Sequence, residues 1–585
     1  MIWSSKRHKP IRQKPLSEGQ SFLLHIVVFS KLHNCSHFVK LMLFYATIKC
    51  NDIGWFMNRI AVYLNQHIDG VVYSAPSILS NYATDRSILR FYPRIVAEPI
   101  NVTDVRRLVK FSSQLATKNI PLPITIRGGG NSKTGSDLGA GLVISMSRMN
   151  RIQEIDTRQR LVRVQAGVTL GELQKALVLQ GLDLPIQGHP SETIGGLISR
   201  NAIASNNTQP GTIADFVQTL EVVLSDGSLA EFGAVSGGAL KRKNKSQNYE
   251  GEIYRSINDL IQRNGARIEE ISQTDHSGYM GLRNVKQKHG INLAPVFCGA
   301  EGTLGVITEV ILRVEPVFET PDYIAIPVDN AKSFVEITQL LQELKFTDIV
   351  FYDTELYNES DNIGKTSKFF RKASNDGYLI LANAKDDSRG ARRRKFRKLA
   401  KKLPNNVRSI RAKAENESDF AALRENLLAY LNDSGQSYHL PLIDNVYIPT
   451  DCQVKFLNGV TELAKDLNVK LAVFGAVEHH VFTVRPSYTP STAEGRRVMI
   501  SFMRKYLELV YQCDGHAFGA APEGRFLAML TQRYREAELT QLYGQIKSIF
   551  DPIDILNPGI KHEIDSRLTL RHFRTDYNAG ILPIE

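Results

Sequence analysis

Hydrophobic and polar positions along the chain follow two periods in turn, which predicts strands alternating with helices. Val102, Val105, Leu108, Val109 and Leu115 recur at helical spacing behind the candidate capping residues Asn101 and Thr103. Shorter apolar or alternating runs predict strands. The elements expected in this half are strands at Leu122–Arg127, Leu142–Met146 and Leu161–Ala166, a helix at Leu170–Leu179, and a hairpin of Val217–Leu224 with Leu229–Phe232 around Asp226-Gly227.

The pattern changes near residue 316, where Pro316 and Pro321 punctuate the chain. Beyond them we expect strands at Tyr323–Val328, Tyr378–Ala382 and Lys470–Phe474, helices at Ala331–Leu344 and Gly390–Leu403, and a helical close through Phe550. Helices mixed with strands in both halves predict an α/β protein of more than one domain.

The chain has 585 residues, of which 43% are hydrophobic and 23% charged, and this composition is typical of globular proteins. More than half of the formal net charge of +12 lies in residues 1–50, where eight basic residues face one acid. A second basic cluster, Arg392–Lys402, is interleaved with Phe396 and Leu399 at helical spacing. It fits either a solvated helix face or a contact with an anionic membrane or nucleic acid, and the solvated face is favoured.

Five cysteines stand far apart, and no Cys-x-x-Cys pair occurs among them. This spacing argues against a disulfide framework or a zinc ribbon and for a reducing compartment. Near the N-terminus, basic residues precede an apolar run that ends at Lys31 without a clear small-residue cleavage site, so we do not expect a secretion signal. Residues 1–56 are expected to be a basic N-terminal extension, with Met57 as a natural beginning.

The most informative local feature is the run Arg127-Gly128-Gly129-Gly130-Asn131-Ser132 directly after a predicted strand. Consecutive glycines let backbone N–H groups converge on an anion. The spelling does not match a P-loop or a dinucleotide fingerprint, and alone it fits a phosphate cradle and a plain surface turn equally. Two further glycine loops, Gly188–Gly196 and Cys298–Thr308, suit a long ligand that carries a diphosphate.

With these three loops in this order, the chain resembles the FAD-binding domain of the vanillyl-alcohol oxidase (PCMH) type. Ser277-Gly278-Tyr279, Asp444–Pro449 and Asn557-Pro558-Gly559 extend the likeness to the group that contains D-lactate dehydrogenases and glycolate oxidase subunits. The resemblance implies a two-part FAD-binding domain, a cap with a ferredoxin-like antiparallel sheet, and a C-terminal helical return. The boundaries that we expect are 1–56 for the extension, 57–316 for the FAD domain, 317–510 for the cap, 511–565 for the return and 566–585 for a tail.

By the same resemblance, the pyrophosphate rests on the first glycine loop, and the other loops line the rest of the cofactor. The implied cofactor-binding residues are Arg127, Gly128, Gly129, Gly130, Asn131, Ser132, Pro190, Ser191, Thr193, Ile194, Gly195, Gly196, Asn201, Ser205, Gly211, Glu301, Gly302, Thr303, Gly305 and Ile307. Some relatives attach flavin through a histidine at the position of Asn131, so we expect non-covalent FAD here.

The catalytic half departs from the family. Ala476 and Thr483 stand where relatives place metal-binding histidines, and Ala520 and Ala521 stand where they place a glutamate and a histidine. The family's metal and base are therefore not carried over. Substitute catalytic candidates are Glu478, His479, His480, Glu523 and His516, and the two adjacent histidines are expected on opposite faces of a strand.

Arginines at matching positions suit a carboxylate substrate, and the candidates are Arg424, Arg485 and Arg525, each with structural salt bridging as the alternative. The resulting hypothesis is an FAD-dependent oxidoreductase that takes a hydride from a small 2-hydroxy acid. The alternatives are a diverged flavoprotein of the same fold, either another alcohol oxidase or a non-redox transferase, and a catalytically silent flavin-binding partner. We expect a cytoplasmic protein, with peripheral contact with the inner membrane face as the alternative, that binds no nucleic acid and passes electrons to a quinone, a cytochrome or oxygen.

Overall fold

The computed structural model describes residues 53–204, 211–271, 274–317, 322–356, 377–384, 388–411, 438–520 and 522–574. The chain divides into two units, residues 1–66 and 67–585. In the described part of the first unit, helix α3 (Ile53–Asn65) passes through the expected boundary at residue 57. The expected extension up to residue 52 lies outside the described residues. The second unit begins at His67.

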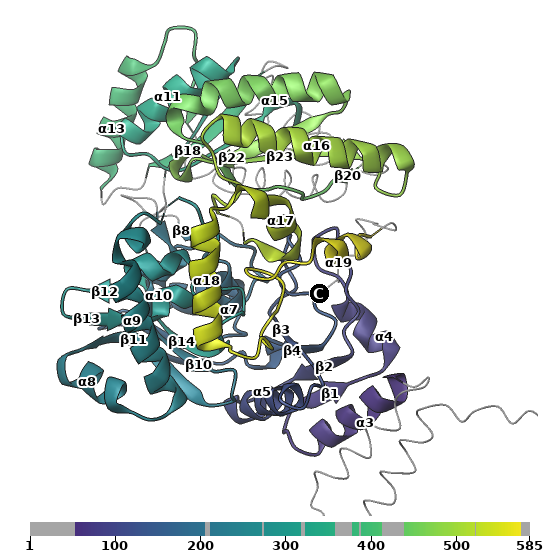
Figure 1. The fold of residues 1–585 in the computed structure, drawn as a ribbon. Helices are drawn as coiled ribbons and strands as arrows, with labels where there is room; N and C mark the ends of the chain where they lie inside the picture. Colours follow the sequence, from purple (N-terminus) through teal and green to yellow (C-terminus); the bar gives the residue numbers. More distant parts are fainter. Residues whose placement is uncertain are drawn as a thin grey trace, which may run out of the picture. The chain divides into compact units, whose positions relative to one another are not determined.

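A four-stranded sheet opens this unit (Figure 1), with β1 (Val71–Tyr73), β2 (Ile95–Glu98), β4 (Leu142–Ser145) and β3 (Ile124–Arg127) in that order. Its last three strands are parallel. Helix α5 (Val102–Ala116) connects β2 to β3 and buries Val105, Leu108 and Leu115. Asn101 caps it by accepting a hydrogen bond from the N–H of Asp104 at 2.9 Å, so of the two predicted caps Asn101 is confirmed.

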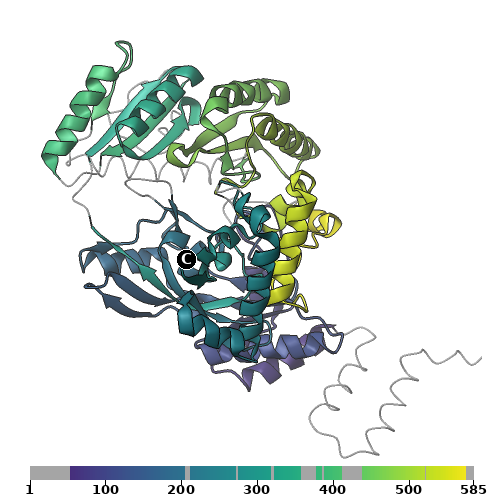
Figure 2. The same ribbon diagram turned by 60° about the vertical axis from the view of Figure 1, so that its left-hand side comes forward.

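A seven-stranded antiparallel sheet follows, ordered β12 (Lys286–Gln287), β13 (Gly290–Asn292), β11 (Leu229–Ser236), β10 (Val217–Val223), β14 (Val306–Arg313), β6 (Leu161–Gln165) and β5 (Ile152–Asp156). The predicted hairpin is confirmed, because Val223 pairs with Leu229 across a turn in which Gly227 has φ +83°. Helix α9 (Tyr249–Glu269) packs beside α18 (Ala537–Phe550), as Figures 1 and 2 show.

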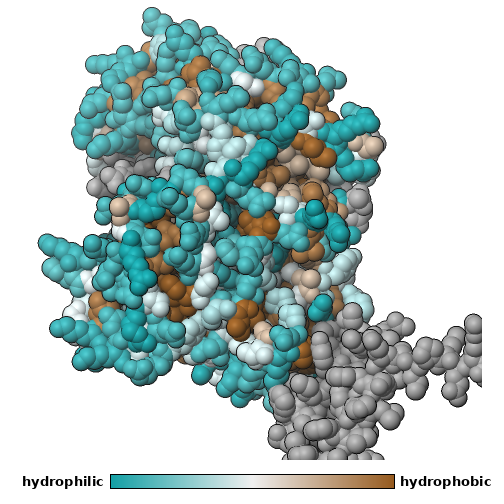
Figure 3. All heavy atoms as spheres, in the orientation of Figure 1, coloured by the Kyte–Doolittle hydropathy of each residue, from teal (hydrophilic) through white to brown (hydrophobic). Residues whose placement is uncertain are grey.

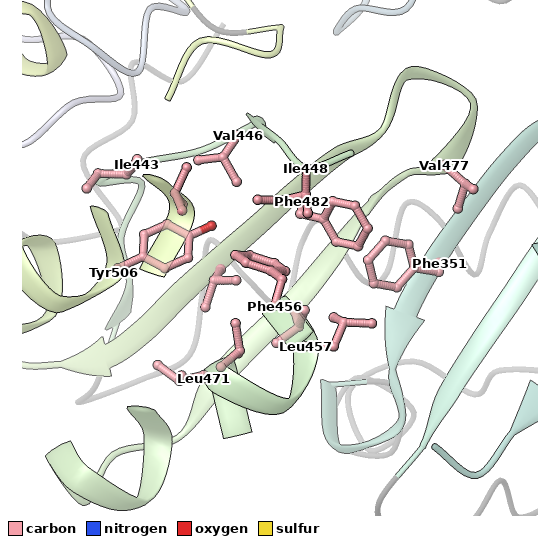
Figure 4. Close-up of a cluster of buried hydrophobic side chains, with 14 of the residues drawn as sticks. Phe351, Ile443, Val446, Ile448, Phe456, Leu457, Leu471, Val477, Phe482 and Tyr506 are labelled. Atoms are coloured by element: carbon pink, nitrogen blue, oxygen red, sulfur yellow. The ribbon is translucent and has the colours of Figure 1, made fainter. Parts of the chain in front are cut away.

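The cap is built on an antiparallel sheet ordered β19 (Ile410–Arg411), β16 (Asp322–Val328), β18 (Tyr378–Ala384), β17 (Thr347–Asp353), β22 (Leu471–Ala476), β23 (Val481–Tyr488) and β20 (Tyr438–His439), with β21 (Val446–Tyr447) also on β23. The helices α11 (Ala331–Glu343), α13 (Arg389–Lys402), α15 (Gln453–Leu467) and α16 (Ala493–Gln512) gather on one side of it (Figure 2). Phe351, Phe456, Phe482 and Tyr506 form the centre of the core between them (Figure 4).

The C-terminal segment returns from the cap to the first sheet. The N–H of Ile124 in β3 donates to the carbonyl of Ile555, and the N–H of Asn557 donates to the carbonyl of Ile124, both at 2.7 Å. Shorter elements complete the described chain: helices α4 (Pro76–Leu79), α6 (Leu170–Val178), α7 (Ile194–Ser199), α8 (Gly237–Lys245), α10 (Ala294–Phe297), α17 (Gly524–Thr531) and α19 (Ser566–Arg571), and strands β7 (Leu182–Asp183), β8 (Ile203–Ala204), β9 (Gly211–Thr212) and β15 (Glu315–Pro316).

Candidate functional site

The first glycine loop leaves β3 and lies directly against the second. A Cβ atom added at Gly128 would clash with Oγ1 of Thr193, and one added at Gly129 would clash with the carbonyl of Ser191. Gly130 has φ +68°, a conformation that favours glycine. The loop therefore needs its glycines both to pack closely and to turn, which distinguishes it from a plain surface turn.

Polar side chains fix the shape of this loop. Nδ2 of Asn131 donates to the carbonyl of Ser191 at 3.3 Å, and Nη2 of Arg127 donates to the carbonyl of Thr84 at 2.8 Å. The hydroxyl of Ser132 accepts hydrogen bonds from the N–H groups of Thr134 and Ser136 at 3.2 and 3.1 Å. These contacts hold the loop through side chains and carbonyl groups.

The third glycine loop reaches the same place from β14. Gly302 packs near Ile126, two residues before Gly128, with a built Cβ 3.4 Å from Cγ1 of that isoleucine. The N–H of Glu301 donates to the carbonyl of Ser199, at the end of α7, at 3.0 Å. All three loops that the sequence singled out thus converge at the end of β3.

The other predicted cofactor residues surround this convergence. Thr193 caps α7 by accepting from the N–H of Gly196 at 3.2 Å, and Thr303 donates to the carbonyl of Ala300 at 2.6 Å. The carbonyl of Pro190 accepts from the N–H of Gly171 at 2.9 Å. Ile194, Gly195, Gly305 and Ile307 are buried, Gly211 lies in β9 next to β8, and Ser205 lies outside the described residues.

Two buried polar atoms beside these loops have no hydrogen-bond partner among the described residues, Oδ1 of Asn201 and Oγ1 of Thr134. Asn201 is held at φ +51°, and its Nδ2 contacts Sδ of Met280 at 3.6 Å. Unsatisfied polar atoms are costly in a protein interior and point to a polar ligand. Together with loops in which added Cβ atoms would clash, they fit a long polar cofactor such as FAD.

A buried network of charges fastens the third loop to the C-terminal return. Nζ of Lys561 lies 2.9 Å from Oε1 of Glu301 and 3.1 Å from Oε1 of Glu523, which also pairs with Arg535. Burial raises the pKa of Glu301 above its ordinary value. Burial alone would also raise the pKa of Glu523, but Arg535 and Lys561 outweigh it and hold that pKa below its ordinary value.

Glu523 is held within this network by several partners. Its carboxylate accepts from the N–H of Gly278 as well as from the two cations, and its side chain is fully buried. The arrangement gives Glu523 a structural task and does not support its predicted part as a substitute base.

The predicted substrate arginines are also engaged with the protein. Arg525 donates to the carbonyls of Leu138 and Pro558 and to Oδ1 of Asn557, at 2.6–2.8 Å. Arg485 binds both carboxylate oxygens of Asp444, at 3.1 and 2.6 Å. Their placement favours the structural alternative for both, and Arg424 lies outside the described residues.

One cation next to Arg485 retains room for a ligand. Nζ of Lys133, three residues after Gly130, lies 3.4 Å from Oδ2 of Asp444, and the Lys133 side chain is 42% exposed. Burial works against the charge on Asp444, but Arg485 and Lys133 outweigh it and lower the pKa of this carboxyl. Burial lowers the pKa of Lys133, whereas the neighbouring Asp444 favours its charged form. With both cations protonated and Asp444 ionised, the group carries one net positive charge.

The adjacent histidines do not lie on a strand, so the expectation of opposite strand faces is wrong. Val477–His479 form a single helical turn between β22 and β23, and His480 follows at φ +54°. The chain must reverse here to pair Ala476 with Val481. Nε2 of His479 contacts the carbonyl of Ala204 at 3.0 Å, whereas Nδ1 of His480 contacts Thr450 and Gln453, each at 3.3 Å.

The remaining predicted bases lie around the same turn. Glu478 is half-buried within it, and the ring of His516 stacks on Tyr447, whose ring is also packed edge-on against His480. Burial lowers the pKa of both His479 and His480. A carbonyl oxygen only accepts hydrogen bonds, so Nε2 of His479 carries the proton and its Nδ1 is left as the acceptor.

Next to His479 lies a small apolar cluster made of Ile203, Ala476, Val481 and Ala520. Two of its members are alanines at positions where the family resemblance implied metal or base residues. The hydroxyl of Thr483, a third such position, accepts from the N–H of Asn445 at 3.0 Å and donates to Oδ1 of the same residue at 3.1 Å. Among the described residues, no group of three or more His, Cys, Asp or Glu side chains is arranged to hold a metal ion.

Comparison with known proteins identifies the two parts. Residues 93–233 match the FAD binding domain model, and residues 320–560 match the model of the C-terminal domain of FAD linked oxidases. The first match contains the glycine loop after β3, and the second contains the cap and the return with Glu523 and Asn557. The chain therefore carries an FAD-binding domain followed by a domain similar to the C-terminal domain of FAD linked oxidases.

Similar proteins agree with this assignment. The chain is 25% identical over 501 residues to D-2-hydroxyglutarate dehydrogenase of Pantoea ananatis, covering 82% of this chain and 48% of that protein. It is 22% identical over 478 residues to D-lactate dehydrogenase of Archaeoglobus fulgidus, covering 80% and 90%. The chain thus spans about half the length of the D-2-hydroxyglutarate dehydrogenase and most of the lactate enzyme.

The fold resembles that of 4-ethylphenol oxidase from Gulosibacter chungangensis, with a TM-score of 0.65, 14% identity and coverage of 89% and 99%. This likeness, together with the antiparallel cap sheet, confirms the predicted fold class. The fold also resembles that of p-cresol methylhydroxylase, with a TM-score of 0.63, 14% identity and coverage of 88% and 98%, so the fold that the resemblance implied is confirmed.

Proposed function

We propose that this protein is an FAD-dependent oxidoreductase that removes a hydride from the CH–OH carbon of a small 2-hydroxy acid. The observation that carries the proposal is the convergence of the three glycine loops at the end of β3, within a chain whose two parts match the FAD binding domain and the C-terminal domain of FAD linked oxidases. Relatives named for 2-hydroxy acids support the substrate class. FAD supplies the two-electron acceptor for such an oxidation.

Different loops of the chain would bind different parts of FAD. We propose that Gly128–Ser132 hold the pyrophosphate through backbone N–H groups, and that the loops around Thr193 and Gly302 line the rest of the cofactor. Asn131 replaces the histidine that attaches flavin in some relatives, and its amide is hydrogen-bonded to Ser191. These features support non-covalent binding of FAD.

The positive charge of Lys133, Asp444 and Arg485 supports an anionic substrate. Because Arg485 and Asp444 neutralise each other, Lys133 has the charge left to attract a carboxylate. We therefore propose Lys133, in place of Arg485 and Arg525, as the group that binds the substrate carboxylate. We propose His479 as the base, and its contact with the carbonyl of Ala204, beside the apolar cluster, supports this choice.

Anaerobic mixing with a panel of D- and L-2-hydroxy acids tests the proposal. Under it, at least one acid bleaches the flavin absorption near 450 nm and yields the 2-oxo acid in equal amount, whereas the matching acid without the hydroxyl does not. A flavoprotein that no 2-hydroxy acid bleaches contradicts the proposed substrate class. That result would favour a diverged flavoprotein, for which the alanines of the apolar cluster are the supporting observation.

The basic helix α13 bears on where the protein is located in the cell. Among the described residues, no helix has the length and apolarity needed to cross a membrane. Helix α13 carries nine basic residues and no acid, and Arg393, Arg394, Arg397 and Lys398 are exposed. The face of the cap that Figure 3 shows is largely hydrophilic. We propose that α13 contacts anionic lipid peripherally, in a cytoplasmic protein that passes electrons to a quinone, a cytochrome or oxygen.

Co-sedimentation with vesicles tests the lipid contact. The protein should sediment with phosphatidylserine vesicles at low salt and stay in solution with phosphatidylcholine vesicles. Reversing Arg393, Arg394 and Lys398 to glutamate should abolish sedimentation. A variant that sediments like the unchanged protein would leave α13 as a solvated helix face.

A further inference from the structure

Two buried carboxyl groups lie together beside the first glycine loop. Asp85 and Asp137 are 5% and 9% exposed, and their side chains are within hydrogen-bonding reach of each other. Oδ1 of Asp85 accepts from the N–H and the hydroxyl of Ser87, at 2.8 and 2.5 Å. Oδ2 of Asp85 and Oδ1 of Asp137 find no donor among the other described residues. Two ionised carboxyl groups repel each other, so this contact needs a proton or a cation between them.

The charge of the surroundings favours a proton. Asp85 is one of the negative charges that act on the guanidinium of Arg525 in α17, which itself donates to three neutral oxygen atoms. If both acids were ionised, this group would keep one uncompensated negative charge in the interior, which is costly. One proton on the pair makes the group neutral, whereas a divalent cation would leave one positive charge. Among the described residues, the pair is also not part of any group of three or more potential metal ligands.

The direction of titration agrees with a bound proton. Burial first, and then the charge of Asp137, raise the pKa of Asp85 well above its ordinary value. A carboxyl group of this kind stabilises the fold at low pH, and its contribution is lost as pH rises through the folded pKa. The other charged or titratable groups that contact residues 82–91 from neighbouring elements are Glu98, Arg127, His572 and Arg574.

The pair lies where two segments meet at the predicted cofactor site. The N–H of Arg86, next to Asp85, donates at 2.9 Å to the carbonyl of Ser132, the last residue of the first glycine loop. On the other side of Asp85, the carbonyl of Thr84 accepts from Arg127, the first residue of the run that forms this loop. Repulsion between the two acids would therefore act on contacts that hold the loop in place.

We propose that Asp85 and Asp137 share one proton, and that this proton keeps residues 84–87 fastened to the first glycine loop and so sustains the binding of FAD. The inference rests on the proposed placement of the FAD pyrophosphate and does not depend on the substrate. At alkaline pH the proton leaves for solvent, and two carboxylates remain that repel each other. The protein then holds FAD less tightly than at neutral pH.

The test compares the unchanged protein with D137N, D85N and the surface control D466N, since the side chain of Asp466 is 64% exposed. Asparagine keeps the shape of the acid, and its amide donates a hydrogen bond to the remaining carboxylate at any pH. The dissociation constant of FAD is measured between pH 7 and 9.5 from the fluorescence of released flavin. A single linked proton changes a binding constant by at most tenfold for each pH unit.

We expect the dissociation constant of the unchanged protein and of D466N to rise by about tenfold more over this range than that of D137N. D85N provides the same comparison if D137N does not fold. An equal rise in the unchanged protein and in the asparagine variants would overturn the proposal. FAD affinity that falls at pH 7 on chelation, and returns with Mg²⁺ or Ca²⁺, would put a cation in place of the proton and would also overturn it.

Urea unfolding of the FAD-free protein tests the proton separately from the cofactor. As pH rises from 7 to 9.5, D137N should become progressively more stable relative to the unchanged protein, because only the unchanged protein has a proton to lose at this pair. Parallel curves for the two proteins would show that no proton is shared. If no FAD binds to the unchanged protein at any pH, the placement of FAD is wrong, and the link to the cofactor fails whatever the unfolding curves show.

Discussion

The buried network around Lys561 allows the sharpest prediction of stability. In K561M the hydrophobic body of the side chain is largely kept, but the cation between Glu301 and Glu523 is lost. Glu523 keeps Arg535, so the carboxylate left without its nearest cation is that of Glu301, whose side chain is 2% exposed. Removing one partner of a buried ion pair costs about 3–5 kcal/mol, and we expect a loss of this size at pH 7.

The loss should depend on pH in a defined direction. Burial already raises the pKa of Glu301, and removing Lys561 raises it further. A carboxyl whose folded pKa lies above its unfolded pKa stabilises the fold at low pH and loses that contribution as pH rises through the folded pKa. The difference between K561M and the unchanged protein should therefore shrink as pH falls from 7 to 5.

Urea unfolding followed by far-UV circular dichroism measures both effects. A matched control is K505M, because Lys505 pairs with Asp466 at 3.1 Å on the surface, where the two side chains are 37% and 64% exposed. That variant should lose less than about 1 kcal/mol. A K561M protein within 1 kcal/mol of the unchanged protein at pH 7, or one whose deficit grows toward pH 5, would refute the reasoning.

Three further predictions concern the site. G130A should lower the FAD content of the purified protein, because Gly130 has φ +68° and an added Cβ would crowd the guanidinium of Arg127, whereas G265A, with nothing within 4 Å, should retain FAD; equal FAD content in both variants would contradict this. K133M should raise the KM for a 2-hydroxy acid about tenfold at unchanged kcat, and an unchanged KM would remove Lys133 from substrate binding. The free energy of unfolding should fall by up to about 3 kcal/mol between pH 6.5 and 4, because the pKa of His276 is lowered in the folded protein and the unfolded chain takes up the proton first. The same fall in the H276N variant would argue against this assignment.

Much of the fold followed from local pattern. The cap of α5 at Asn101, the Asp226-Gly227 hairpin and the glycine loop after β3 depend on neighbouring residues, so periodicity and turn chemistry were enough to predict them. Their placement in space depends on contacts between distant residues, such as that between Ile124 and Asn557, more than 400 positions apart, which local pattern does not predict.

The catalytic residues were harder to predict, because their partners are also distant in the sequence. Glu523 and Arg525 looked available in the sequence, but their partners Lys561 and Asn557 come from the C-terminal return. At Val477–His479 the structure has a turn in place of the predicted strand, because the chain must reverse there to pair β22 with β23. The burial of His276, beside Ser277-Gly278-Tyr279, is likewise visible only in three dimensions.

The central claim is that the chain holds FAD without a covalent bond. It is tested most directly by the visible spectrum of the purified protein, followed by acid precipitation and analysis of the supernatant. The account predicts flavin bands near 370 and 450 nm and release of about one FAD per chain into the supernatant. A colourless protein that takes up no added FAD would contradict flavin binding, and yellow colour that stays in the precipitate would contradict the non-covalent site at Asn131.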